Sequence, residues 1–121
     1  MPKAPLIAIV DDDDDMREAL ADLLLAHGLS SSTYDRAEAF LAQYAPGAFG
    51  CIVTDVRMPG MSGLELLRHL RRLGDAVPVV VVTSDSSPKA RLQALEAGAH
   101  AFMTKPVEDA ALLGHLQSAL G

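Results

Sequence analysis

Apolar stretches of strand length alternate with segments of helical period along this chain. The expected strands cover residues 6–10, 31–34, 51–54, 77–83 and 101–103. Apolar residues at helical spacing predict helices over residues 16–27, 37–44, 64–73, 92–97 and 110–120. Strands and helices that alternate through short loops form a parallel sheet with right-handed crossovers. The pattern therefore predicts an α/β architecture with helices on both faces of one sheet.

The expected strands differ in how much of each should be buried. Residues 77–83 contain five valines around one proline, which is typical of a strand buried on both faces. Residues 31–34 are more polar and suit the edge of the sheet. We expect a (βα)5 flavodoxin-like, doubly wound fold with a five-stranded parallel sheet in the order 2-1-3-4-5. In such folds, ligands bind outside the carboxyl ends of the strands.

The starts of the helices show capping patterns. In three of them a capping residue precedes a Glu by three positions: Asp15 with Glu18, Asp35 with Glu38, and Ser62 with Glu65. Ser87 precedes Pro88, which is suited to the first position of a helix. We interpret Asp13 and Asp14 as part of a solvated acidic loop.

Bulk composition narrows the class of protein. The 121 residues, half of them hydrophobic, are enough for one domain, which we expect to span residues 1–121 without an output domain in this chain. A net charge of −6 argues against direct contact with nucleic acid. Residues 1–5 do not resemble a signal peptide, and no apolar run is long enough to span a membrane. The lone Cys51 reads as a small buried hydrophobe in a reducing compartment, so we expect a cytoplasmic protein.

Carboxylates follow two strands that should be neighbours. Asp11 and Asp12 come directly after residues 6–10, and Asp55 ends the run 51–54. Two unit charges about 4 Å apart repel by roughly 4 kcal/mol at an effective dielectric of 20. A cluster of three carboxylates is therefore costly unless a cation joins them. Oxygen ligands with open water positions suit Mg²⁺, so we expect a magnesium site here.

Asp55 is either a metal ligand alone or a nucleophile that forms an acyl phosphate. Metal ligation alone leaves Lys105 and Thr83, which follow or end two further strands, without a role. Phosphoryl transfer needs cations and donors around the phosphoryl oxygens. Lys105 offers a charge, Thr83 a hydroxyl and Ser84 a backbone N–H. Their joint placement favours phosphoryl transfer to Asp55.

Several motifs, in this order, resemble the receiver domain of two-component response regulators over essentially the whole chain. They are Ile9-Val10-Asp11-Asp12, the stretch from Asp55 through Met58-Pro59, Met61 and Gly63 to Glu65-Leu66, Val82-Thr83-Ser84, Ala97-Gly98-Ala99, and Phe102 with Lys105-Pro106. Val56-Arg57-Met58-Pro59 and the Phe at position 102 are most similar to the FixJ-like group.

The resemblance implies residue roles. Asp55 would accept a phosphoryl group from a sensor histidine kinase. Magnesium would be held by Asp11, Asp12, Asp55 and the backbone carbonyl of Arg57. Thr83 and Lys105 would contact the phosphoryl group, Phe102 would be a rotating aromatic, and Lys105-Pro106 would be a cis bond.

The resemblance also implies an output. Phosphorylation would switch the surface formed by the helix that contains residues 92–97, the strand 101–103 and the helix 110–120, and the chain would form a homodimer through it. FixJ-like members usually carry a C-terminal DNA-binding domain, so the expected role is transcription regulation. A stand-alone regulator that acts by protein–protein contact is the alternative. The chain would not be an enzyme beyond self-phosphorylation from acyl phosphates and autodephosphorylation.

Other interpretations fit less well. A haloacid-dehalogenase-type phosphatase needs an acid where this chain has Arg57, and a flavin-binding module needs a phosphate-cradling loop where this chain is acidic. A receiver-like domain that no longer accepts phosphate would not keep all its functional positions. Asp85 departs from the FixJ-like pattern: its carboxylate lies either near the attacking water, where it would alter the acyl-phosphate lifetime, or in solvent. The four histidines show no metal-binding spacing.

Overall fold

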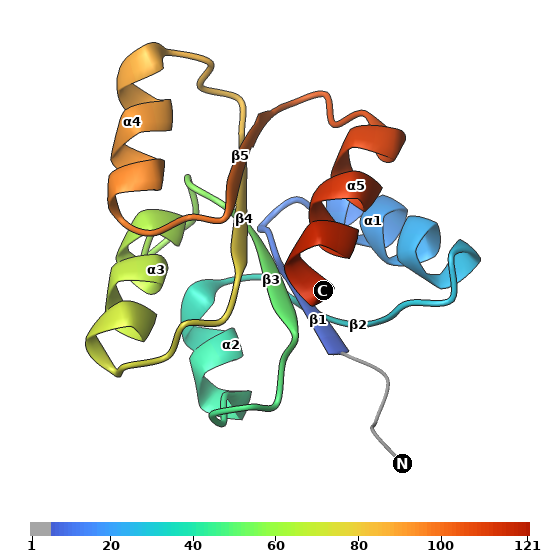
Figure 1. Cartoon of the computed structure of the whole chain (residues 1–121), viewed down its shortest axis with the longest axis horizontal. Helices are drawn as coiled ribbons and strands as arrows, with labels where there is room; N and C mark the ends of the chain where they lie inside the picture. Colours follow the sequence, from blue (N-terminus) through green and yellow to red (C-terminus); the bar gives the residue numbers. More distant parts are fainter. Residues whose placement is uncertain (1–5) are drawn as a thin grey trace.

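The computed structural model describes residues 6–121, so residues 1–5, which the sequence predicts not to be a signal peptide, lie outside the described residues. Five strands alternate with five helices along them (Figure 1): β1 (Leu6–Val10), α1 (Asp14–Ala26), β2 (Ser30–Tyr34), α2 (Ala37–Gln43), β3 (Cys51–Asp55), α3 (Gly63–Arg72), β4 (Val79–Thr83), α4 (Pro88–Glu96), β5 (Ala101–Thr104) and α5 (Asp109–Leu120). The expected number, type and order of elements are confirmed over this range.

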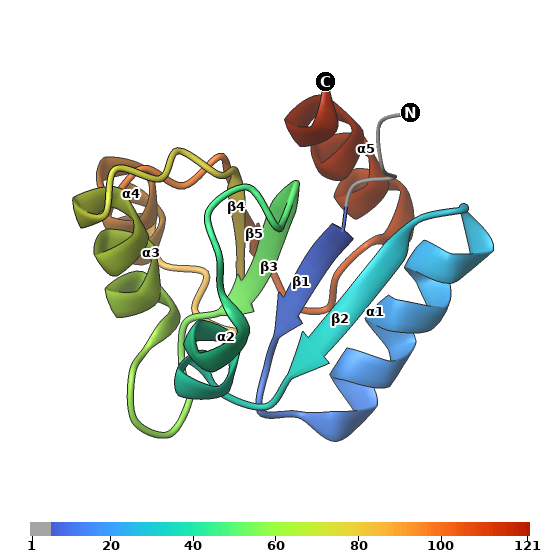
Figure 2. The same cartoon turned by 90° about the horizontal axis from the view of Figure 1, so that it is seen from below.

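One parallel sheet organises the molecule. Its strand order is β2-β1-β3-β4-β5, as expected for a flavodoxin-like fold. Helices α1 and α5 cover one face of the sheet, and α2, α3 and α4 cover the other (Figures 1 and 2). Because every strand is parallel, all the carboxyl ends lie at the same edge of the sheet.

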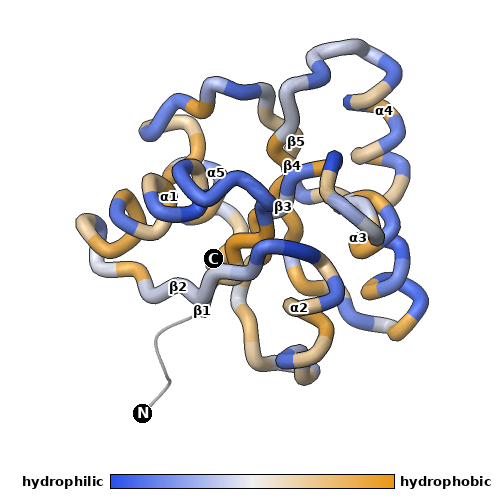
Figure 3. The backbone as a smooth tube through the Cα atoms, turned by 180° about the vertical axis from the view of Figure 1, so that it is seen from behind, coloured by the Kyte–Doolittle hydropathy of each residue, from blue (hydrophilic) through white to orange (hydrophobic). Residues whose placement is uncertain are grey.

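Each face of the sheet has its own hydrophobic core, because successive strand residues point to opposite faces. In β1, Ile7 and Ile9 face α1 and α5, whereas Ala8 and Val10 face α2 and α3. All five residues of β3 and of β4 are buried. The central strands are orange in Figure 3, and the edge strand β2 is paler because it is rich in serine. Cys51 is fully buried, as expected for a small hydrophobe.

Strand β4 begins two residues later than the sequence predicts. The amide of Val77 donates to the Asp75 carboxylate over 2.9 Å. Pro78 has no amide hydrogen to contribute to a ladder. The valine-rich run is therefore strand only from Val79 onward.

The acidic run before α1 caps the helix at a different residue than expected. Asp13 is the N-cap, and its side chain accepts from the amides of Asp15 and Met16. Asp15 lies in the first turn of the helix instead. Any of the successive aspartates could cap the helix. Asp13 does so here because α1 begins at Asp14, directly after it.

The predicted capping box of α2 is also wrong. The N-cap is Arg36, which makes no side-chain cap bond, and Asp35 forms an ion pair with Arg36 over 3.2 Å. The Glu38 side chain accepts from the Met61 amide in a different loop.

Helices α3 and α4 begin as predicted. Ser62 and Glu65 form a complete capping box at α3. Ser87 caps α4, with Pro88 as the first helical residue.

Candidate functional site

Four strands deliver polar side chains to the same edge of the sheet. Asp11 follows β1, Asp55 ends β3, and Thr83 ends β4. The β4–β5 ladder continues one step past β5, because the amide of Lys105 donates to the Thr83 carbonyl over 2.8 Å. The parallel register therefore brings Asp11, Asp55, Thr83 and Lys105 to one edge, as the sequence predicts.

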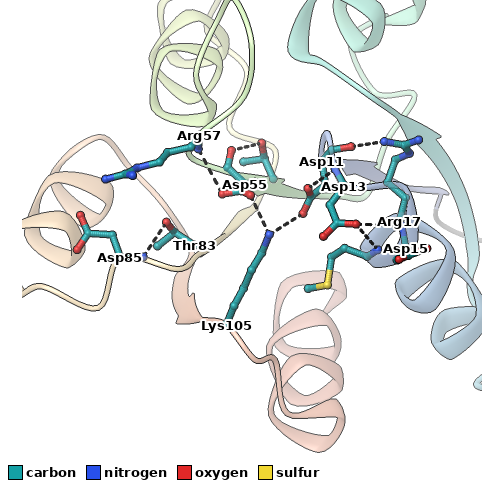
Figure 4. A network of polar contacts seen from close by, with 11 residues as sticks. Asp11, Asp13, Asp15, Arg17, Asp55, Arg57, Thr83, Asp85 and Lys105 are labelled. Atoms are coloured by element: carbon teal, nitrogen blue, oxygen red, sulfur yellow. Dashed lines mark hydrogen bonds and ion pairs between the residues drawn. The ribbon is translucent and has the colours of Figure 1, made fainter.

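Lys105 joins two of the carboxylates. Its Nζ lies 2.8 Å from Asp55 Oδ2 and 3.2 Å from Asp11 Oδ2. Figure 4 shows the lysine side chain reaching between Asp55 and Asp11. Asp11 is 3% exposed and Asp55 is 8% exposed, so these charges meet in a largely dehydrated place, where their interaction is stronger than in water.

The electrostatics of the site show opposing effects on two groups. Burial raises the pKa of the Asp11 carboxyl, although the Asp13 amide and the Lys105 charge oppose this change. For Lys105, burial alone would lower the pKa, but hydrogen bonds and charges from Asp55 and Asp11 outweigh it and raise the pKa. Lys105 is therefore held as a cation beside the two acids.

Three carboxylates form a group compatible with a divalent cation. One oxygen each from Asp11, Asp12 and Asp55 lies within 4.8 Å of the others. Asp11 and Asp55 are buried, whereas Asp12 is exposed, so the group opens to solvent on one side. Hard carboxylate oxygens with room for water are the ligands that Mg²⁺ prefers, so these residues fit the expected metal. No histidine belongs to a metal-binding group among residues 6–121.

The loop between β3 and α3 lies tightly against Asp55. A Cβ at Gly63 would lie 2.0 Å from the Asp55 carbonyl oxygen, so only glycine fits there. The Gly63 amide donates to the Val56 carbonyl over 3.0 Å. The Arg57 amide donates to Asp55 Oδ1 over 3.3 Å. The hydrogen bond from Arg57 therefore helps to orient the Asp55 side chain.

Two contributions to the site were missed at the level of sequence. Arg17 of α1 donates to the Asp11 carbonyl over 2.6 Å and pairs with Asp14, which holds the acidic loop in place. Glu38 of α2 accepts from the Met61 amide over 3.1 Å and so contacts the loop after Asp55. No local signal marks either role, because both depend on contacts between separate elements.

The remaining predicted residues lie on the β4 and β5 side of the site. Thr83 is buried, and its Oγ1 accepts from the Asp85 amide over 3.2 Å. Ser84, which directly follows Thr83, is exposed. Phe102 is half-buried and packs against the core shared with α3 and α4. Lys105-Pro106 is a cis peptide bond, as the resemblance implied.

Comparison with known proteins agrees with this geometry. Residues 7–117 match the family model described as the response regulator receiver domain. The chain belongs to this family. The receiver domain is 43% identical over 121 residues to the transcriptional regulatory protein FixJ of Azorhizobium caulinodans, which covers all of this chain and 57% of FixJ.

Two solved structures share its fold closely. A crystal structure of FixJ-N has a TM-score of 0.86 at 36% identity, covering 98% of this chain and 95% of the other. A BeF3-activated DrrB receiver domain has a TM-score of 0.88 at 30% identity, covering 98% of both chains. The receiver domain spans about half the length of the curated relatives it matches. None of the helices in residues 6–121 has the length and apolar character needed to cross a bilayer.

Proposed function

We propose that this receiver domain accepts a phosphoryl group on Asp55 from a sensor histidine kinase. The observation that carries the proposal is the ion pair between Lys105 and Asp55, set beside the acidic group at the carboxyl edge of the sheet. A lone metal site would not need a lysine that joins two of its carboxylates. A phosphoryl acceptor needs such a cation, because the incoming group is negatively charged.

The residues divide the chemistry between them. A carboxylate oxygen of Asp55 attacks phosphorus, an O–P bond forms, and the P–N bond to the kinase imidazole breaks, leaving its electron pair on nitrogen. Lys105 neutralises charge on the phosphoryl oxygens. The Thr83 Oγ1 accepts a hydrogen bond from the Asp85 amide. The hydroxyl proton of Thr83 is therefore free to be donated to a phosphoryl oxygen. The backbone N–H of Ser84, an exposed residue, would offer a further donor.

Asp11, Asp12, Asp55 and the Arg57 carbonyl would hold Mg²⁺. When bound, the ion supplies positive charge against the phosphoryl oxygens. The four proposed ligands lie in the loop after β1, at the end of β3 and in the loop after β3. Phosphorylation ends on Asp55, and later hydrolysis of the acyl phosphate restores the carboxylate.

The output that we propose is a change of the surface made by α4, β5 and α5. Thr83 and Phe102 lie on the same face of the sheet, because Thr83 pairs with Thr104 and Val81 pairs with Phe102. A shift of Thr83 toward the phosphoryl group would therefore change the packing on the face of the sheet where Phe102 lies. We propose that the altered surface forms a homodimer and, in the natural cytoplasmic protein, controls transcription through a separate DNA-binding domain. Action as a stand-alone regulator is the second candidate.

Magnesium binding should stabilise the apo receiver domain. An ion at ten times its Kd adds about 1.4 kcal/mol to the free energy of unfolding, which raises the melting temperature by about 5 °C. Asp12→Ala should lose this rise, measured by thermal denaturation with and without millimolar Mg²⁺. Asp22→Ala removes the same charge from an exposed position on α1 and should keep the full response. A normal response in Asp12→Ala would place the ion elsewhere.

Asp85 should have little effect on the lifetime of the acyl phosphate. Its carboxylate accepts from the Ser87 amide over 2.9 Å, and Figure 4 shows it pointing away from Asp55. Hydrogen bonding to Ser87 lowers the pKa of the Asp85 carboxyl. We expect the acyl phosphate of Asp85→Ala to hydrolyse within about twofold of the wild-type rate. This corresponds to a change of only about 0.4 kcal/mol in the barrier.

The decay should be followed by intact mass after removal of the phosphoryl donor. Ser86→Ala, at an exposed neighbouring position, serves as the control for disturbance of the loop. If the decay rate changed tenfold in Asp85→Ala but not in Ser86→Ala, the Asp85 carboxylate would have to act on the attacking water.

A further inference from the structure

The loop that follows Asp55 is contacted from outside by one side chain of α2. Glu38 Oε2 accepts from the Met61 amide over 3.1 Å. The same carboxylate oxygen would lie 2.2 Å from a Cβ at Gly60, a residue with φ +75°. The hydrogen bond and the short approach to Gly60 both involve Glu38 Oε2, and together they place this carboxylate against the loop at Gly60 and Met61.

Val56, Met58 and Met61 of this loop pack against the core on this face of the sheet, and the other hydrogen bonds described for the loop join residues close together in the chain. Gly63 bonds Val56, and Ser62 and Glu65 cap α3 over 3.1 and 3.2 Å. Glu38 differs because it is 23 residues from Met61 along the chain and belongs to a separate helix. In Figure 2 the loop between β3 and α3 curves beside α2. Glu38 thus adds a hydrogen bond from α2 to the apolar packing that holds the loop.

This contact replaces one that would have stabilised α2 itself. The pattern Asp35-x-x-Glu38 is suited to a capping box, in which Glu38 would reach back to the start of its own helix. In the structure α2 begins at Ala37 without a side-chain cap, and Glu38 contacts Met61. A residue that breaks a favourable local pattern in this way is expected near a functional site.

We propose that Glu38 is a positioning residue for the phosphorylation site. By holding Gly60 and Met61, it fixes the loop whose Arg57 amide contacts Asp55 Oδ1 and whose Arg57 carbonyl is a proposed metal ligand. Glu38 touches neither the phosphoryl group nor the metal. This inference rests on the proposed function of Asp55, and it adds α2 to the elements that set the geometry of the site.

Glu38→Ala tests the proposal, with Glu38→Gln as the conservative variant. The Gln amide oxygen has the same reach and can still accept from the Met61 amide. In Glu38→Ala we expect the Met61 amide proton to exchange faster. The Mg²⁺ affinity should fall about three- to tenfold, the range of one net hydrogen bond. The rate of phosphorylation by acetyl phosphate at subsaturating Mg²⁺ should fall by the same factor. Glu38→Gln should stay near wild type in all three measurements.

NMR gives the amide exchange rate and the Mg²⁺ affinity, and intact mass gives the phosphorylation rate. Glu18→Ala, which removes an exposed glutamate from α1, is the matched control. Unchanged Mg²⁺ affinity and phosphorylation in Glu38→Ala would overturn the proposal, as would unchanged Met61 exchange. A wild-type chain that takes up no phosphoryl group would instead refute the function of Asp55, while Met61 exchange and Mg²⁺ affinity would still report on Glu38.

Discussion

The wild-type receiver domain should gain the mass of one phosphoryl group when it is incubated with acetyl phosphate and Mg²⁺, and the Asp55→Asn variant should gain none. The amide of Asn carries no negative charge and is a poor nucleophile, so the O–P bond cannot form. Asp55 is the carboxylate that contacts both Lys105 Nζ and the Arg57 amide. We therefore expect Asp55→Asn to lose phosphorylation completely.

Several comparisons make this experiment specific. Omission of Mg²⁺ should suppress labelling of the wild-type chain, because Lys105 alone must then offset the charge of the incoming group. Asp22→Asn, which alters an exposed aspartate on α1, should be labelled like the wild type. Labelling of Asp55→Asn at the wild-type level would assign the acceptor to another residue.

The sequence predicts where the proposed site residues lie in those cases in which the topology alone determines their position. Asp11, Asp55, Thr83 and Lys105 each stand at the end of a strand, and parallel strands bring such ends to one edge whatever the details of packing. Burial of β4 on both faces follows equally from its valines. These predictions need only the order of the elements and the period of their side chains.

Contacts between elements were not predictable in the same way. Glu38 has two possible partners, its own helix start and the Met61 amide, and only the packing of α2 beside the β3–α3 loop decides between them. Asp13 and Asp15 are both able to cap α1, and the choice depends on where the acidic loop leaves β1. The position of Lys105 between two acids likewise depends on distances across three strands.

The second large effect concerns the response to phosphorylation. A phosphoryl group adds about −1.5 to −2 charges and three acceptor oxygens at the end of β3. Thr83 ends the neighbouring strand, with its side chain on the face of the sheet where Phe102 packs. Under the proposed mechanism, movement of the Thr83 hydroxyl toward the new oxygens would free space for the Phe102 ring to turn inward. A switch from about 1% to about 99% active needs about 5.5 kcal/mol of differential stabilisation.

The surface that this switch would alter already exposes apolar side chains. Leu92 is 56% exposed and Leu95 is 41% exposed, both on α4. Exposed leucines on α4, the helix that contacts β5, are suited to a contact with a second copy once Phe102 has turned inward. An unmodified chain that keeps Phe102 half-buried on this side would then be mainly monomeric.

Sedimentation with and without beryllofluoride measures this response, since that ion mimics the phosphoryl group on an aspartate. We expect the wild-type chain to change from monomer to dimer, and Thr83→Ala to respond weakly because it has no hydroxyl to draw toward the bound group. Thr33→Ala, on the exposed side of the edge strand β2, should dimerise normally. A treated wild-type chain that stays monomeric at high concentration, without NMR shift changes in α4, β5 and α5, would exclude the mechanism, because the site and the surface would then not be coupled.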